Sequence, residues 1–220
     1  MMNNYTAKNA YQNDHNAVQY DKTRFTSIRG KYLDRLEKMS ILRCLSTAFS
    51  GCSPSSICLL DIPCGTGRIT ETLLLTGYKV FGADISDEMM EVARKRLQQF
   101  SGIKGLYKED IEQLSFDNSV FDATTCVRLM GHLPMENKKA ALRELARVSN
   151  KFVIVTFYIS NMKNDLKRIV TKKLFNKTAP WHPLTRREVI LLVNDCGLNI
   201  VKYCDVHKLI SEASTYLLKV

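Results

Sequence analysis

Two glycines and a carboxylate, separated by apolar runs, stand out between Leu59 and Ser86, in the segment LLDIPCGTGRITETLLLTGYKVFGADIS. Gly65 and Gly67 directly follow the first apolar run. Glycine lets a backbone approach a ligand closely, with the N–H groups of the next helix pointing at it. Asp84 ends the second run, where a carboxylate can accept both hydroxyl hydrogens of a ribose. Together these residues predict a pocket for a nucleoside.

A regular alternation of strand-like and helix-like segments must position these residues. The expected strands are 57–62, 79–85, 105–110, 120–127, 152–159, 199–206 and 214–220. The expected helices are 23–49, 67–75, 87–99, 136–148 and 185–198. This spacing predicts an α/β fold whose mainly parallel sheet has helices on both faces. A ligand site is then expected at the carboxyl ends of the strands.

Helix-end signals support this division of the chain. Ser86 is expected to be the N-cap of the helix that follows it. Thr185 and Glu188 have the spacing of a capping box, and Gly197 suits the end of that helix.

Composition predicts one large, intracellular α/β domain. The chain has 220 residues, of which 45% are apolar and 25% charged, which are ordinary globular values. Its seven cysteines are scattered without a CxxC pair or Cys/His cluster, so neither a metal site nor a disulfide framework is indicated. The polar N-terminus lacks a signal peptide's apolar core, and the longest apolar run, 152–159, is too short to span a bilayer. We therefore expect a cytoplasmic protein with reduced cysteines and no transmembrane segment.

A net charge of +10 permits an anionic substrate, an acidic membrane surface or RNA as a partner. Segment 161–177 has apolar residues on one helical face and six basic residues against one aspartate. It is interpreted either as a solvated helix at the sheet edge or as a basic cap over an anionic or membrane-associated acceptor. No nucleic-acid-binding module is visible. Nothing in the sequence indicates the oligomeric state.

Four segments in this order, LDIPCGTGR, GADIS, KEDIEQLSFDNSVFDATTC and RLMGHLP, resemble the class I S-adenosylmethionine-dependent methyltransferases. The resemblance is closest to the branch that includes ubiquinone and menaquinone biosynthesis enzymes. It covers residues 57–158, and more loosely the rest of the chain. It implies a Rossmann-like fold with seven strands, the last one antiparallel, and S-adenosylmethionine as cofactor. It also implies a lid and helix in 1–50, before a methyltransferase domain in 51–220.

The resemblance further implies a set of cofactor-binding residues. The residues implied at the methionine end are Asp61, Cys64, Gly65, Gly67, Val127 and Arg128. Those implied at the ribose and adenine are Asp84, Ile85, Asp110 and Ile111. Those implied in the lid are Tyr20 and Arg24. One departure stands at Pro63, where the family usually has the first glycine of its motif. Proline removes one backbone N–H donor there.

Methyl transfer to a hydroxyl would benefit from a general base with a near-neutral pKa, which favours histidine. His132, after the fourth strand, is the candidate base or substrate contact, with a packing role in its loop as the alternative. Trp181 and His182 precede the last helix, where related enzymes often form the acceptor pocket, and are candidate substrate contacts. A surface-loop role is the alternative for His182. The sequence therefore favours O-methylation of a small molecule, without a metal.

Other functions compete with this interpretation. RNA methylation, or another N-methylation, is compatible with the positive charge. An NAD(P)-binding oxidoreductase is less compatible, because Thr70 stands in place of the third glycine of that motif. Strand 120–127 and the closing pair of strands also do not suit a second mononucleotide-binding half. A cofactor-binding protein without transfer activity is the third alternative.

Overall fold

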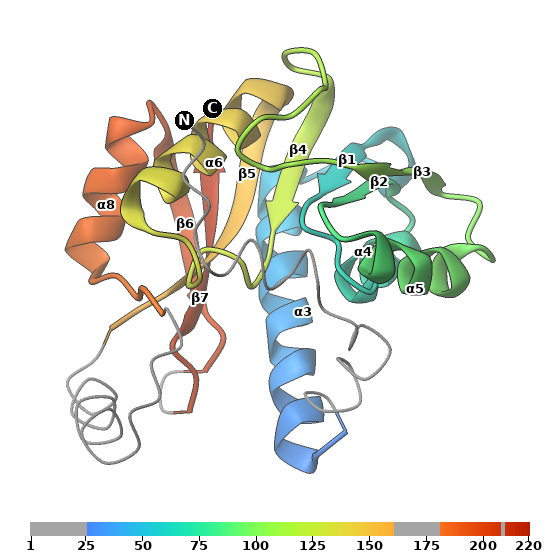
Figure 1. Cartoon of the computed structure of the whole chain (residues 1–220), viewed down its shortest axis with the longest axis horizontal. Coiled ribbons are helices and arrows are strands. Elements are labelled where there is room, and N and C mark those ends of the chain that lie inside the picture. Colours follow the sequence, from blue (N-terminus) through green and yellow to red (C-terminus); the bar gives the residue numbers. More distant parts are fainter. Residues whose placement is uncertain (1–25, 161–180, 208–209) are drawn as a thin grey trace.

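A seven-stranded sheet between two layers of helices forms the body of the molecule (Figure 1). The computed structural model describes residues 26–160, 181–207 and 210–220. The strands are β1 (Cys58–Asp61), β2 (Lys79–Asp84), β3 (Ile103–Lys108), β4 (Phe121–Cys126), β5 (Ser149–Tyr158), β6 (Asn199–Asp205) and β7 (Ala213–Lys219). The helices are α3 (Ile28–Ala48), η1 (Pro54–Ser56), α4 (Arg68–Leu75), α5 (Asp87–Leu97), α6 (Met135–Val148) and α8 (Arg186–Asp195).

The strand order is β3-β2-β1-β4-β5-β7-β6. Strands β1 to β5 run parallel, and β7 lies antiparallel between β5 and β6. This confirms the predicted α/β fold with a mainly parallel seven-stranded sheet and an antiparallel last strand. The order reverses between β1 and β4, so the loops after these two strands diverge at the carboxyl edge of the sheet. In open α/β sheets, such a reversal is where ligands bind.

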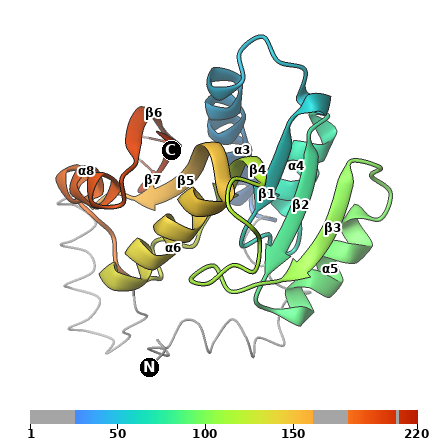
Figure 2. The ribbon, with the colours of Figure 1, turned by 90° about the horizontal axis from the view of Figure 1, so that it is seen from above.

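The strands are apolar on both faces because helices cover both faces (Figure 2). Successive side chains of a strand point to opposite sides. Leu60 accordingly packs with the core beneath α6 and α8, whereas Leu59 packs with α3, α4 and α5. In β5, Val153 likewise packs with the core beneath α6 and α8, and Ile154 packs with α3, α4 and α5. Burial on both faces explains why these strands appear in the sequence as nearly continuous apolar runs.

Helix ends follow the predicted capping signals. Ser86 accepts a hydrogen bond from the N–H of Met89 at 3.2 Å, as an N-cap does. Thr185 and Glu188 form the complete capping box, and Gly197 has a φ of +74° just beyond α8. The helix predicted from Gly67 begins one residue later, because Gly67 is itself the N-cap with a φ of +80°.

The predicted N-terminal region, 1–50, contains α3 in its described part, and α3 packs on β7, β6, β5 and α4. Its division from 51–220 stays a prediction. Among the described residues, no helix is both long and apolar enough to cross a membrane. All seven cysteines are free, and within the described ranges no group of acidic, histidine and cysteine side chains could hold a metal ion.

Lys138 is a lysine buried in α6, with 1% of its surface exposed. Its Nζ donates to the backbone carbonyls of Leu133 and, at 3.0 Å, of His182. It therefore joins the loop after β4 to the segment before α8. Burial lowers the pKa of Lys138 from 10.5 to about 8, although Glu188 acts in the opposite direction.

Lys138→Met should remove a pH-dependent part of the stability. Between pH 8 and 10.5 the unfolded chain binds more protons at this position than the folded chain, so the wild type gains stability as pH rises. The unfolding free energy of the wild type relative to Lys138→Met should therefore increase by up to about 1.4 kcal/mol per pH unit in that window. Urea denaturation at pH 7, 8, 9 and 10 measures it, with Lys139→Met as the control. A constant difference across the window would contradict the prediction.

Candidate functional site

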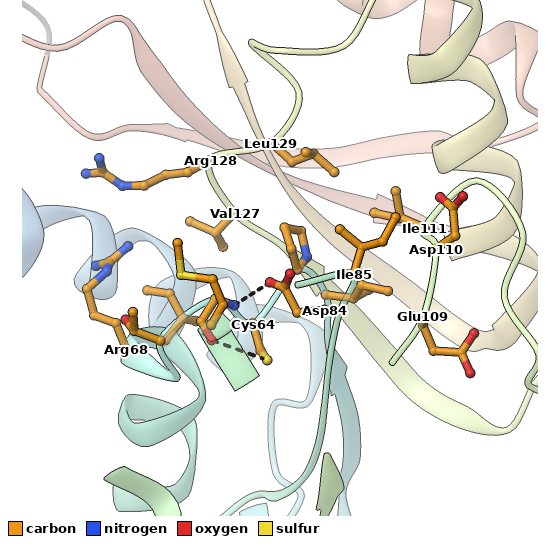
Figure 3. Close-up of a pocket in the computed structure, with 16 residues that line it drawn as sticks. Cys64, Arg68, Asp84, Ile85, Glu109, Asp110, Ile111, Val127, Arg128 and Leu129 are labelled. Atoms are coloured by element: carbon orange, nitrogen blue, oxygen red, sulfur yellow. Dashed lines mark hydrogen bonds between the residues drawn. The ribbon is translucent and has the colours of Figure 1, made fainter. Parts of the chain in front are cut away.

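A cavity of about 960 Å³, counted with its open mouth, lies at the carboxyl edge of the sheet (Figure 3). It is lined by the loops that follow β1, β2, β3 and β4 and by the first turns of α4 and α5. The lining residues are Ile62, Pro63, Cys64, Gly65, Thr66, Arg68, Ile69, Asp84, Ile85, Met89, Glu109, Asp110, Ile111, Val127, Arg128 and Leu129.

Asp84 is the central polar group of the cavity. Its carboxylate is 5% exposed and accepts hydrogen bonds from the backbone N–H of Gly65 at 2.8 Å and of Ser86 at 3.0 Å. Burial raises the pKa of Asp84, and the hydrogen bonds from the backbone oppose that rise. A carboxylate has about four acceptor positions, so acceptor capacity remains for a hydroxyl donor in the cavity.

Asp61, predicted to contact a cofactor, lies behind the cavity rather than among its lining residues. It is 1% exposed, and its two oxygens accept hydrogen bonds from the hydroxyls of Thr70 at 2.6 Å and Thr125 at 2.7 Å. Burial raises the pKa of Asp61 to about 6, despite these bonds and the nearby Arg68. The structure thus gives Asp61 a supporting position, and its direct contact with a cofactor stays a prediction.

The glycine loop is held by its own N–H groups. Cys64 N–H donates to Ala83 O at 2.7 Å, and Gly67 N–H donates to Cys64 O at 2.9 Å. Gly65, with a φ of +55°, gives its N–H to Asp84. Burial keeps the pKa of the Cys64 thiol well above its ordinary value, so Cys64 lines the cavity as a neutral group. Three N–H groups of this loop, those of Cys64, Gly65 and Gly67, thus donate to partners within the protein.

Gly67 faces away from the cavity and is not among its lining residues. A Cβ on Gly67 would lie 3.1 Å from a methyl group of Leu97 and 3.3 Å from Cβ of Ala93, both in α5. Its positive φ and this close packing both favour glycine. Its role in the structure is to let α4 begin against α5.

The two ends of the cavity differ in charge. Glu109 and Asp110 lie at one end and Arg68 and Arg128 at the other, with Asp84 between them (Figure 3). The Oδ1 of Asp110 accepts the N–H of Glu112 at 3.1 Å, which fixes the turn after β3.

Apolar side chains lie on the walls between the two charged ends. Ile85 and Ile111 approach the acidic end, and Val127 approaches the basic end (Figure 3). The cavity can therefore accept an elongated ligand with an apolar body and different polar groups at its two ends.

His132, Trp181 and His182 gather beside the cavity but do not line it. The rings of His132 and Trp181 lie 5.1 Å apart, and Trp181 packs against Tyr158 at 4.4 Å. His182 N–H donates to Gly131 O at 2.7 Å, which brings the segment before α8 to the loop after β4. Burial and Lys138 lower the pKa of His182.

Most of the predicted cofactor residues come together around this one cavity. Eight of them line it: Cys64, Gly65, Asp84, Ile85, Asp110, Ile111, Val127 and Arg128. The predicted lid residues, Tyr20 and Arg24, and the basic segment 161–177 lie outside the described residues. The lining residues that sequence reasoning missed include Arg68, Met89, Glu109 and Leu129. Arg68, Glu109 and Leu129 lie within quoted motifs and Met89 lies three residues after one, so their place in or beside a motif was the available signal.

Comparisons with known proteins identify a methyltransferase domain in part of the chain. Residues 59–151 match a family model described as a methyltransferase domain. A ubiquinone biosynthesis O-methyltransferase from Coxiella burnetii is 36% identical over 76 residues, which cover 34% of this chain and 32% of the relative. The chain thus spans about a third of the length of the first curated relatives that it matches. A magnesium-protoporphyrin O-methyltransferase from Synechocystis is 26% identical over 151 residues, covering 64% and 63%.

The fold agrees with solved structures over nearly the whole chain. A crystal structure of magnesium protoporphyrin IX methyltransferase from Synechocystis PCC 6803 with bound SAH gives a TM-score of 0.74 at 17% identity. It covers 96% of this chain and 98% of the other. A methyltransferase structure from Methanosarcina mazei gives 0.62 at 20% identity, covering 74% and 92%. At these identities the likeness shows the fold.

Asp61→Asn should remove one component of the pH dependence of stability. With a folded pKa of about 6 against an ordinary 3.8, the folded chain binds more protons at Asp61 between pH 4 and 6. Stability from this group therefore falls as pH rises through that window. The unfolding free energy of the wild type relative to Asp61→Asn should decrease by up to about 1.4 kcal/mol per pH unit. Urea titrations at pH 4, 5, 6 and 7 measure it, and the exposed Asp87→Asn is the control. A difference in unfolding free energy that does not change with pH would contradict the raised pKa of Asp61.

Proposed function

We propose that this chain transfers the methyl group of S-adenosylmethionine to a small molecule. The proposal follows from its class I S-adenosylmethionine-dependent methyltransferase domain. The single observation that carries the proposal is the position of Asp84, between an acidic and a basic end of one cavity. An adenosyl group linked to an amino acid has polar groups in the matching order. The adenine amino group is at one end, the ribose hydroxyls are in the middle, and the amino-acid carboxylate is at the other end.

The polar lining matches the proposed cofactor from end to end. Asp84 would accept the ribose hydroxyls, and Asp110 would accept the adenine amino group. Ile85 and Ile111 would contact the faces of the ring. Val127 and Arg128 would line the methionine portion. The cofactor supplies a methyl group that the sulfonium has already activated. The chain's own residues therefore need to bind, orient and exclude water.

We further propose an oxygen acceptor on a small molecule. The relatives named above are O-methyltransferases by their names, which supports oxygen. His132 lies in the loop that continues from Leu129 of the cavity wall, and its ring contacts Trp181. This arrangement supports an acceptor site bounded by His132, Trp181 and His182. Whether the acceptor is anionic or membrane-associated is a further proposal, supported by the net charge of +10.

The alternatives have less support. Dinucleotide-binding folds have the order 3-2-1-4-5-6 in a mostly parallel sheet, whereas an antiparallel β7 separates β5 from β6 here. RNA methylation stays compatible with the net charge of +10, and RNA is therefore included in the methyl-transfer screen described below. A cytoplasmic location is proposed because all seven cysteines are free, as in a reducing compartment.

Asp84→Asn should weaken binding of S-adenosylhomocysteine by at least about tenfold, since hydrogen bonds to charged groups contribute about 1.5–3 kcal/mol. An asparagine amide cannot accept at both positions that Gly65 N–H and Ser86 N–H now occupy. Isothermal calorimetry measures the change. The control Asp87→Asn, on the exposed start of α5, should change the affinity less than twofold.

The same calorimetry decides between cofactors. The proposal fails if the wild type binds NAD but not S-adenosylhomocysteine. A methyl-transfer screen over phenols, quinol precursors, amines and RNA then identifies the acceptor. Transfer to RNA or amines alone would overturn the proposed oxygen acceptor. Binding without any transfer would support a non-catalytic cofactor-binding protein.

His132→Gln should lower kcat by about 10²- to 10⁴-fold if His132 is the general base, with the affinity for S-adenosylhomocysteine unchanged. Single-turnover kinetics with the identified acceptor measures the chemical step. The matched variant His182→Gln should instead raise KM for the acceptor. Full activity in His132→Gln would leave His132 with a packing role against Trp181.

A further inference from the structure

Lys138, in α6, joins the two chain segments that bound the proposed acceptor site. These are the loop after β4 and residues 181–184 before α8. The Nζ of Lys138 donates to the carbonyl of Leu133 in the loop and, at 3.0 Å, to that of His182 in the second segment. Lys138 itself does not line the cavity. Its contacts therefore act on the backbone at both sides of the acceptor site.

A buried lysine opposes stability at this place in α6. The residue is 1% exposed, and burying an ammonium group is unfavourable unless hydrogen bonds compensate for the lost water. Further along the same helix, the buried residues Ala141, Leu142 and Leu145 are apolar. An apolar residue at position 138 would continue that face without the cost of burying a charge. The lysine is better explained by the two carbonyls that it holds.

Trp181 lies directly on the backbone of Gly131, in the loop after β4. A Cβ on Gly131 would lie 2.6 Å from both Cζ3 and Cη2 of Trp181 and 2.8 Å from Cδ2 of Tyr158. The indole can take this position because residue 131 has no Cβ. The indole Nε1 also donates to Glu212 at 3.4 Å, and the ring packs edge-on against Tyr158 and His132. The loop and the indole thus form one wall beside the cavity.

Backbone hydrogen bonds fix residues 181–184 against this wall. His182 N–H donates to Gly131 O at 2.7 Å, and Leu184 N–H donates to Tyr158 O at 2.9 Å. His182 is therefore bound to the loop through its N–H and to Lys138 through its carbonyl. Because His182 directly follows Trp181, the contact with Lys138 constrains the position of the indole.

We infer that Lys138 is a positioning residue, which holds His182 to the loop after β4 and thereby keeps the indole of Trp181 beside the candidate base. The inference rests on the proposed function and adds to it a residue that touches neither the cofactor nor the acceptor. Through Lys138, α6 determines the shape of the acceptor site, whereas cofactor binding does not depend on it.

Trp181 is the only tryptophan of the chain, so its fluorescence reports on this wall alone. Lys138→Met removes both donors and should shift the emission to longer wavelength and increase quenching by acrylamide, because the indole moves into water. Spectra are taken at pH 7 on protein whose folding circular dichroism verifies. Lys139→Met is the matched control, because Lys139 pairs with Asp195 at 3.4 Å, and both signals should stay unchanged. An unchanged spectrum in Lys138→Met would overturn the inference.

The enzymatic consequence is a difference between the acceptor and the cofactor. With a phenol or quinol acceptor from the methyl-transfer screen, Lys138→Met should raise the acceptor KM at least about fivefold, since a displaced wall no longer orients the acceptor. The Kd for S-adenosylhomocysteine, measured by calorimetry, should change less than about twofold, because Lys138 does not line the cavity. A merely structural lysine predicts equal losses for both ligands or for neither, and either result would refute the positioning role.

Gly131→Ala tests the same wall with Lys138 intact. The added Cβ should displace the indole, with the same change of Trp181 fluorescence and a higher acceptor KM. Since both variants act through Trp181, Gly131→Ala should raise KM less than about twofold further in the Lys138→Met background. Effects of the two substitutions that simply add would contradict this coupling.

If Lys138→Met does not fold, Lys138→Gln takes its place, because the glutamine side chain has amide donors but is too short to reach both carbonyls. An unchanged Trp181 spectrum in Lys138→Gln, or an unchanged acceptor KM in Gly131→Ala, would refute the inference. A wild type that transfers a methyl group to no acceptor would instead overturn the proposed function. The fluorescence of Trp181 would still decide on Lys138, so the two failures are distinguishable.

Discussion

The site depends on the two backbone hydrogen bonds that the Asp84 carboxylate accepts. The donor at 2.8 Å, Gly65 N–H, comes from the loop after β1, and the donor at 3.0 Å, Ser86 N–H, from the start of α5. One buried charge therefore joins the ends of two neighbouring strands. Because Cys64 N–H also donates to Ala83 O, the glycine loop is bound to the end of β2 at two successive residues, Cys64 and Gly65. The shape of the cavity follows from this connection.

Keeping acids charged at this edge opposes stability. Burial raises the pKa of both Asp61 and Asp84, and hydrogen bonds from hydroxyls and backbone N–H groups, together with Arg68 near Asp61, oppose that rise. A fold optimised for stability alone would place uncharged groups there. Perturbed pKa values in a cavity are common at functional sites, so the raised pKa of Asp84 agrees with a ligand site at this edge.

The parts of the fold that local spacing determines could be predicted from the sequence. The alternation of strands, the cap at Ser86 and the position of Asp84 after β2 all depend on residues close to one another in the chain. The contact between Glu37 and Arg128 joins residues 91 positions apart, and no local pattern marks it. Asp61 shows the same limit: its motif was visible, but its partner Thr125 lies 64 positions away in β4. Tertiary packing decides such contacts.

Pro63 reduces the number of backbone donors at the basic end of the cavity, where Arg68 and Arg128 lie. It removes one N–H from the loop, and the N–H groups of Cys64, Gly65 and Gly67 donate to partners within the protein. Four positions of the loop therefore offer no donor to an anionic group of a ligand. In many nucleotide sites such backbone groups carry that role. At that end of the cavity the lining offers two positively charged side chains, those of Arg68 and Arg128. Both arginines donate hydrogen bonds to Glu37 of α3, so this helix helps to orient the side chains at the basic end of the cavity.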